Sequence, residues 1–576
     1  MSALEEFSIA ATRNYLQSVV FVDDRIFDVR SGMPVQPIEL PRPRKPIFQR
    51  VPEGNAVQVP PDNNAEAAAE QAYHPKELVS SFAREGIICA LYEPPIEFFT
   101  DPTSEIFRIC ERPDIIILDW DFSGDNGRRV LDLISALVTQ SEKALPHHIR
   151  LLAIYTADPS LVAVANKISD RLREDGFVAE PHLSQCRLQA GATRLLVFGK
   201  GEPRFGTDEE QFTVKESELA TRLIQEFADM NAGILPSYAL HGMAAIRRNS
   251  KRILERFHGQ MDGAFLLHRL LSRGSEEAFD QLPALLAEEL LAVLEAERLA
   301  SDKTTAIANE AASTMQFSPP RKDWMDLSGK KIASTALVAS EVLKDLLLSG
   351  ALDLAKYKSV AHAVNIVNYG FKGIDPDLMA DFLAMVDTAN LAANERLASL
   401  FSTRTQYETN TRMLSYGTIV RQLQIETDNQ YWIYSFCLMP VCDSIRLDQS
   451  TQGRKGQAIR FPFWRLRENV FSNSEAARRG LAVNTPDAVH VSLSAGGKSR
   501  DMLWLAGFKA DPMSGMVLAI RNQRERFVFL TDTNEEIEWV GQLKPLHAQR
   551  IAHDIALGLS RVGLLEAEWL RLLCDR

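Results

Sequence analysis

Five polar residues in the first part of the chain stand where apolar runs end. They are Asp23, Asp24, Asp119, Thr156 and Lys200. Such runs are typical of buried parallel strands, and the carboxyl ends of parallel strands meet at one edge of a sheet. The sequence therefore predicts that three carboxylates, a hydroxyl group and an ammonium group share one site.

The residue types in this set fit phosphoryl transfer. Carboxylates at close range repel one another, so the site needs a bound proton or a divalent cation, and Mg²⁺ prefers oxygen ligands. Asp119 can then attack a phosphoryl group and form an acyl phosphate. The metal and Lys200 would offset charge on the transferring oxygens, and Thr156 would donate a hydrogen bond to one of them. We therefore expect a phosphoacceptor site that uses Mg²⁺, with Asp23, Asp24 and Asp119 as metal ligands.

Alternating strands and helices are expected to position these residues. The predicted strands cover 18–22, 87–93, 114–120, 150–156 and 193–199, and the predicted helices cover 75–86, 96–111, 127–140, 161–175 and 215–230. Fully apolar strands that alternate with helices indicate an α/β domain with a parallel sheet and helices on both faces. We place this domain at residues 1–232. Its segment 30–75 is predicted to be a loop insertion, because nine prolines lie between Pro34 and Pro75.

The order of these motifs resembles the receiver domains of two-component response regulators, over about residues 14–230. That family has an acidic pair after its first strand, an acceptor aspartate after the third, a serine or threonine after the fourth and a lysine after the fifth. The segment DWDFSGDNG (119–127) also keeps the family spacing, with Gly127 eight residues beyond the acceptor. The resemblance implies a flavodoxin-like sheet of order 2-1-3-4-5, a metal ligand in the backbone carbonyl of Asp121, and a sensor histidine kinase as partner.

Two local departures from the family pattern concern the output of such a domain. Lys200 is followed by Gly201, where the family usually has proline, and the aromatic switch position three residues before the lysine is Val197. Phe198 is adjacent, but neighbouring residues of a strand face opposite ways. We therefore expect retained phosphoacceptor chemistry with an altered or missing output switch.

A competing interpretation is an enzyme. The motif DWD (119–121) also resembles the nucleophile motif of haloacid-dehalogenase-type phosphatases, in which Asp121 would be the general acid. Those enzymes place this motif near the chain start and their extra acidic pair last. Here the acidic pair comes first, which favours a phosphoacceptor signalling protein that is not an enzyme beyond its own phosphorylation.

The remaining sequence predicts three further parts. Residues 233–400 have helical periodicity, 401–545 carry short aromatic-rich runs typical of a mainly antiparallel β domain, and 546–576 are predicted helices. Two segments, YWIYSFCLMPVCDSIRL (431–447) and LSRVGLLEAEWLR (559–571), resemble the phosphate-buffering response regulators of the Detocs anti-phage defence system. That resemblance implies a phosphate sink that shares its kinase with a second, effector-bearing regulator. The alternative is that phosphorylation switches the helical and β-rich parts, which then bind a protein or a nucleic acid.

Composition narrows the classes of partner. The chain has 576 residues and a net charge of −12, which argues against a dominant nucleic-acid or membrane role. Its six cysteines form no CxxC pair, the N-terminal segment lacks the positive charge of a signal peptide, and no run of 18 apolar residues occurs. We therefore expect a cytoplasmic protein with reduced thiols. A homodimer is a further possible state. The basic, aromatic segment 453–467 is interpreted as a half-buried strand in preference to a nucleic-acid site.

Overall fold

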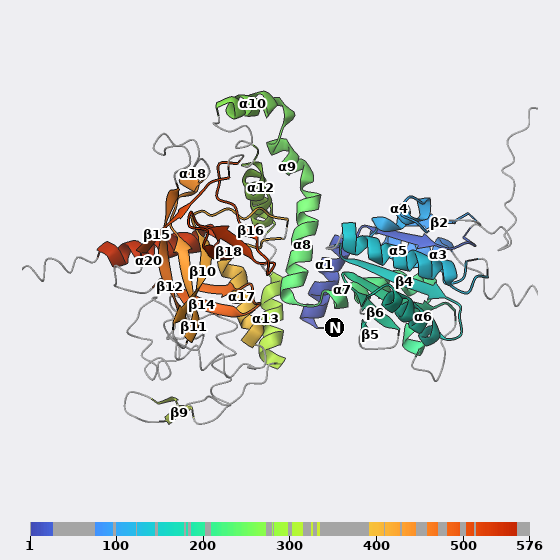
Figure 1. The fold of residues 1–576 in the computed structure, drawn as a ribbon. Helices are drawn as coiled ribbons and strands as arrows, with labels where there is room; N and C mark the ends of the chain where they lie inside the picture. The colour runs from blue at the N-terminus through green and yellow to red at the C-terminus, as the bar shows by residue number, and fades with distance from the viewer. Residues whose placement is uncertain are drawn as a thin grey trace, which may run out of the picture. The chain divides into compact units, whose positions relative to one another are not determined.

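A computed structural model gives the fold, and its parts are coloured by residue number in Figure 1. The structure describes residues 2–26, 75–95, 100–122, 124–144, 148–177, 180–181, 186–201, 209–271, 279, 281–297, 302–314, 324–325, 331–333, 391–407, 409–426, 429–444, 458–469, 481–495, 503–511 and 514–560. The chain divides into two compact units, Met1–Glu310 and Ala311–Arg576. The predicted proline-rich insertion lies almost entirely outside the described residues.

The first unit is built on a seven-stranded sheet. Its strands are β1 (Ser18–Val22), β2 (Ile88–Tyr92), β3 (Ile115–Leu118), β4 (Arg150–Thr156), β5 (Glu180–Pro181), β6 (Arg187–Ala190) and β7 (Thr193–Gly199). Strands β3 and β4 are buried along their whole length, as their unbroken apolar sequences predict. The spatial order is β2-β1-β3-β4-β7-β6-β5, and the pairs from β2 to β7 are parallel.

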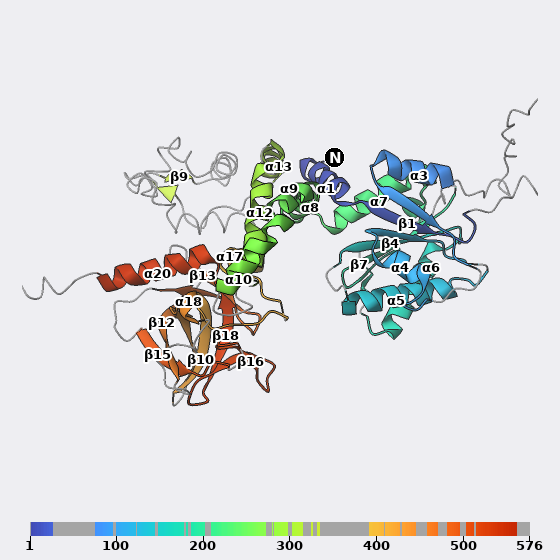
Figure 2. The same ribbon diagram turned by 90° about the horizontal axis from the view of Figure 1, so that it is seen from above.

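Helices cover both faces of this sheet. They are α1 (Ala3–Tyr15), α3 (Pro75–Arg84), α4 (Glu105–Glu111), α5 (Arg128–Ala144), α6 (Leu161–Glu174) and α7 (Glu216–Met230). Helices α3 and α7 lie on one face and α4, α5 and α6 on the other (Figure 2). Because each helix turns its apolar stripe to the sheet, one continuous core joins all of these elements.

The predicted strand order was correct for the parallel strands but incomplete. If β7 is counted as the fifth parallel strand, the order is 2-1-3-4-5. Beyond it, β6 and β5 extend the sheet as antiparallel strands. Both are short, and β6 alternates half-buried and buried residues, so the local sequence shows no apolar run of the kind that marks the central strands.

Further helices belong to the same unit. They are α8 (Ile234–Arg248), α9 (Ser250–Arg256), α10 (Asp262–Leu271), α12 (Leu282–Ala296) and α13 (Asp302–Thr314), the last of which crosses the unit boundary. Helix α1 packs against α7 and α8, and the buried hydroxyls of Ser8 and Ser237 form a hydrogen bond of 2.8 Å between α1 and α8. The polypeptide after residue 232 is therefore joined to the α/β part through the N-terminal helix.

The prediction of an all-α region at 233–400 needs one correction. The antiparallel pair β8 (Trp324–Met325) and β9 (Lys331–Ala333) lies inside it. Strands of two and three residues are too short to show a period in the sequence. Most of 315–390 lies outside the described residues.

The second unit is dominated by a nine-stranded antiparallel sheet. Its strands are β10 (Thr418–Glu426), β11 (Asn429–Cys437), β12 (Ile459–Asn469), β13 (Leu481–Asn484), β14 (His490–Ser494), β15 (Leu503–Phe508), β16 (Ile520–Arg521), β17 (Phe527–Leu530) and β18 (Glu536–Gln542). The order is β13-β14-β12-β11-β10-β18-β17-β16, with β15 also paired to β12. The prediction of a mainly antiparallel β part is confirmed, and a helix follows it from residue 545 to 560; the rest of the predicted helical segment 546–576 lies outside the described residues.

Both faces of this sheet are covered, which explains its aromatic-rich sequence. Neighbouring residues enter different cores: Ile419 and Phe436 lie in one, Val420 and Cys437 in the other. The first core also takes residues from the C-terminal helix α20 (Pro545–Ser560). The other helices of this unit are α17 (Leu391–Ser402) and α18 (Val441–Ser444). No helix among the residues that the structure describes is long and apolar enough to cross a membrane.

Candidate functional site

The strand register brings the predicted site residues to one edge of the first sheet. Val22 pairs with Leu118, Leu118 with Ile154, and Thr156 with Gly199, so the four strands that carry the site end at similar heights. Backbone hydrogen bonds continue past these ends. The Asp119 amide donates to the Val22 carbonyl over 2.9 Å, and the Lys200 amide donates to the Thr156 carbonyl over 2.7 Å.

The acidic residues and the lysine form a compact cluster. Lys200 Nζ donates to Asp119 Oδ1 over 2.7 Å and to Asp23 Oδ2 over 3.0 Å. Carboxylate oxygens of Asp23, Asp24 and Asp119 all lie within 4.8 Å of one another. Asp23 is buried, whereas Asp24 and Asp119 are partly accessible from outside. Four of the five predicted site residues therefore lie close together; the fifth, Thr156, is described below.

Burial and charge set the protonation of this cluster. Burial raises the pKa of Asp119 to about 6, and the neighbouring charge of Asp23 adds to the rise, while Lys200 opposes it. Burial by itself lowers the pKa of Lys200, but the charges of Asp119 and Asp23 outweigh this effect, so that its pKa is raised. Lys200 therefore remains an ammonium ion, and Asp119 titrates in mildly acidic solution.

The donor set fits a divalent cation. Three carboxylate oxygens at this separation can bind one ion together, and hard cations of the Mg²⁺ class take such oxygen ligands. A bound divalent cation also removes the mutual repulsion that raises the Asp119 pKa. Asp23, Asp24 and Asp119 are the residues that would hold it.

Thr156 lies at the end of β4, which runs between the strands that precede Asp119 and Lys200. Its hydroxyl oxygen accepts a hydrogen bond from the Asp158 amide over 3.0 Å, which leaves the hydroxyl proton as a possible donor. Tyr155 precedes it and is fully buried. The Tyr155 hydroxyl donates to the Val214 carbonyl over 2.8 Å, and Lys200 Nζ lies 5.6 Å from the centre of its ring.

The loop after Asp119 is shaped by Trp120 and Gly127. Gly127 has a φ of +86°, and a Cβ at this position would overlap the buried Trp120 ring. The Asp121 side chain accepts from the Asn126 amide over 2.8 Å and so closes the loop on itself. This contact uses one of the two carboxylate oxygens of Asp121. The role of the Asp121 carbonyl as a metal ligand stays a prediction.

Two residues that support the site were not foreseen. Asp125 accepts hydrogen bonds from the amides of Gly127 and Arg129 and so caps α5, a pattern that its position before the helix could have indicated. Glu209 accepts from the amides of Leu161 and Val162 at the start of α6 over 3.2 and 3.1 Å. No local signal marks Glu209, because its partners lie 48 and 47 residues away in sequence.

Two segments of the second unit carry thiol or basic side chains. In the segment 431–447, Cys437 is buried in the second sheet, and burial raises its pKa to about 12, which excludes a reactive thiolate near neutral pH. Within segment 453–467 the described residues from Ile459 lie on β12, whose side chains alternate between core and surface, as expected for a half-buried strand.

Comparison with known proteins agrees with this geometry. Residues 15–204 match the family model described as response receiver domain. Searches among curated proteins and among solved structures gave no match to the chain. The matched region contains all of β1 to β7 and every residue of the acidic cluster. The first unit of this protein therefore contains a response receiver domain.

Proposed function

We propose that this response regulator accepts a phosphoryl group from a sensor histidine kinase onto Asp119. The observation that carries the proposal is the 2.7 Å contact between Lys200 Nζ and Asp119 Oδ1 inside a group of three carboxylates. The Asp119 carboxylate would contact both Lys200 and a bound divalent cation. Lys200 is therefore placed to offset the charge of a phosphoryl group on that carboxylate. We count the protein as a phosphoacceptor and not as an enzyme with turnover.

Each side chain has a definite task in this transfer. A carboxylate oxygen of Asp119 attacks phosphorus, the bond from phosphorus to the donor nitrogen breaks, and an aspartyl phosphate forms. Lys200 moves its ammonium contact from the carboxylate to a phosphoryl oxygen, and Thr156 donates its hydroxyl proton to another. A bound Mg²⁺ supplies further charge neutralisation between the carboxylates and the phosphoryl group.

We further propose that the protein acts as a phosphate sink. Support comes from position 197, where a buried valine stands in place of an aromatic ring that could swing between two positions. Phe198 does not replace it, because its ring packs in the core 6.4 Å from that of Phe212. The two segments that resemble phosphate-buffering regulators of anti-phage systems favour the same role. The kinase would then be shared with a second regulator that carries an effector.

The acceptor is tested by phosphotransfer from the autophosphorylated cognate kinase with radiolabelled phosphate. Asp119→Ala should abolish labelling, because the variant lacks the carboxylate that attacks phosphorus. Asp132→Ala is the matched control, since Asp132 lies on α5 with a half-exposed side chain that pairs with Arg171. Label that stays on Asp119→Ala would refute the assignment, and continuous release of phosphate from a small phosphodonor would indicate a phosphatase.

The sink role is tested by competition. With kinase and a second receiver in one tube, wild-type protein should reduce the label on that receiver, whereas Asp119→Ala should not. In cells that carry the whole system, Asp119→Ala should cause self-activation and slow growth. The output-switch alternative makes the opposite prediction, because loss of phosphorylation would then silence the response.

A further inference from the structure

The second unit contains a cavity of about 610 Å³ that the phosphoacceptor chemistry does not use. It lies where α17 packs against β13 and β14. A volume of this size is typical of pockets for small organic molecules. Both hydrogen-bonding and apolar side chains line it, so a ligand could make polar and apolar contacts there.

The charge of the cavity is predominantly positive. Its charged lining residues are Arg396, Arg404, Arg526 and Glu525. Glu525 is neutralised by an ion pair of 2.8 Å with Arg521. Arg526 is held by Asp487 over 2.8 Å and forms a fixed part of the wall. The uncompensated charge comes from Arg396 and Arg404.

Both of these arginines have guanidinium groups without an ion pair or hydrogen bond among the described residues. Arg396 lies on α17, and Arg404 follows that helix with its backbone amide bonded to the Gln542 carbonyl over 2.7 Å. This bond fixes the start of the Arg404 side chain beside β18. Guanidinium groups bind carboxylate and phosphate through paired N–H donors, and such charge-assisted bonds are about twice as strong as neutral ones.

The other lining residues suit a ligand that is larger than a bare anion and has an apolar part. Leu400 is 53% exposed although it lines the cavity, and the half-buried Phe527 adds apolar surface. The half-buried His490 adds an imidazole group to this lining.

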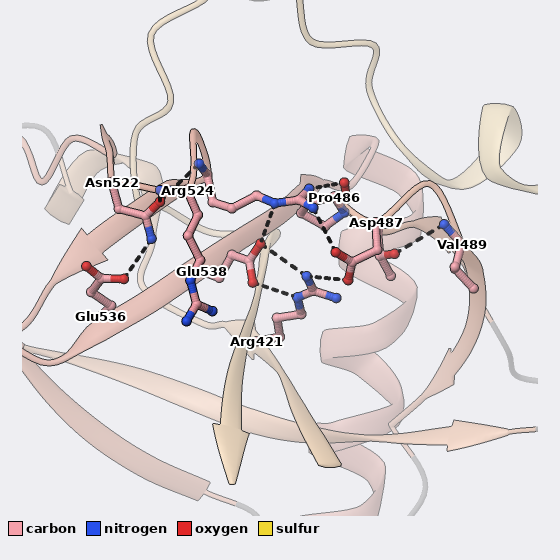
Figure 3. Close-up of polar contacts among 10 residues, drawn as sticks. Arg421, Pro486, Asp487, Val489, Asn522, Arg524, Glu536 and Glu538 are labelled. Atoms are coloured by element: carbon pink, nitrogen blue, oxygen red, sulfur yellow. Dashed lines mark hydrogen bonds and ion pairs between the residues drawn. The ribbon is translucent and has the colours of Figure 1, made fainter. Parts of the chain in front are cut away.

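A second cavity in the same unit shows that the positive excess is local. That cavity, of about 620 Å³, contains four arginines and four acidic residues, so its charges balance. Figure 3 shows Arg421 between the carboxylates of Glu538 and Asp487, with contacts of 2.9 and 2.7 Å. Arg421 also stacks on Trp432 at 3.8 Å. Arg421 is thus held by its own acidic partners, whereas Arg396 and Arg404 have none among the described residues.

We propose that the 610 Å³ cavity binds a small organic anion. Arg396 and Arg404 bind its carboxylate or phosphate group, and Leu400 and Phe527 contact its apolar part. The response regulator thus has a ligand site in its β-rich unit in addition to the phosphoacceptor site. Binding there does not depend on Asp119, so the two proposals can fail separately.

The test uses the full-length protein in EDTA, which prevents magnesium-dependent phosphorylation. Phenyl phosphate and benzoate each join an anionic group to an aromatic ring, and titration calorimetry measures their binding. We expect saturable binding of at least one of them to one site, and the better of the two identifies the anionic group. Phenol and inorganic phosphate, each with half of the chemistry, should bind about tenfold more weakly or not at all.

Variants then locate the site. Arg396→Ala and Arg404→Ala should each weaken binding about tenfold, since each loses a charge-assisted contact. Arg404→Lys should lose less, because the charge remains. Arg524→Ala is the matched control, an exposed arginine of the balanced cavity, and should bind as wild type does. Absence of saturable binding at millimolar probe, or equal binding by wild type and both alanine variants, would overturn the proposal. Circular dichroism checks that the variants fold.

Discussion

The raised pKa of Asp119 predicts that magnesium binding expels a proton in mildly acidic solution. The cation and the proton compete for the same carboxylate, whose pKa is about 6 without metal. At pH 5.5 roughly 0.8 of the molecules carry that proton, whereas at pH 8 almost none do. Binding of Mg²⁺ should therefore release about 0.8 proton at pH 5.5 and about zero at pH 8. Its apparent affinity should be roughly fourfold weaker at the lower pH.

Titration calorimetry in two buffers with different heats of ionisation measures the released protons directly. Lys200→Met provides the informative variant. Because Lys200 lowers the Asp119 pKa, its removal should extend proton release to higher pH. Asp119→Asn is the control, since it keeps the shape of the site and removes the titrating group.

A particular outcome would refute this reasoning. An Asp119 with an ordinary pKa near 3.8 would be only about 2% protonated at pH 5.5. Release of less than roughly 0.2 proton, with normal magnesium binding, would therefore show that burial does not raise the pKa. The same shift has a consequence for the metal-free fold. Since the folded pKa is raised, the contribution of Asp119 to stability should increase as the pH falls from about 6 towards 4.

Two substitutions away from the acidic cluster test the packing around it. Gly127→Ala should lower the free energy of unfolding by about 1–3 kcal/mol, because it adds strain at a positive φ and overlaps Trp120. Urea denaturation measures this change. An unchanged denaturation midpoint would contradict the described loop. Glu226→Gln should lower the free energy of unfolding by about 3–5 kcal/mol, because the buried carboxylate accepts a hydrogen bond of 2.9 Å from Arg187. Asp170 is exposed and provides the control. Asp170→Asn should change the free energy of unfolding by less than about 0.5 kcal/mol in the same assay.

The sequence by itself determined which polar groups follow the buried strands of the first unit. Apolar runs such as IIIL at 115–118 identify buried parallel strands locally, and the residue that follows each run is then expected at the functional edge. For this reason the places of Asp119, Thr156 and Lys200 at this edge can be predicted from residue type and position in the chain alone. The antiparallel β part is likewise indicated by its short, aromatic-rich runs, since period and residue type are local properties.

Only the tertiary structure decided features that join distant segments. The contact of Lys200 with Asp23 spans 177 residues, and its length follows from strand register and not from sequence spacing. The β5–β6 extension and the capping of α6 by Glu209 depend on partners that no local pattern reveals. The cavity beside Arg396 and Arg404 exists because a helix and a sheet do not fill the space between them. Local sequence sets which groups are present, whereas packing sets which of them meet.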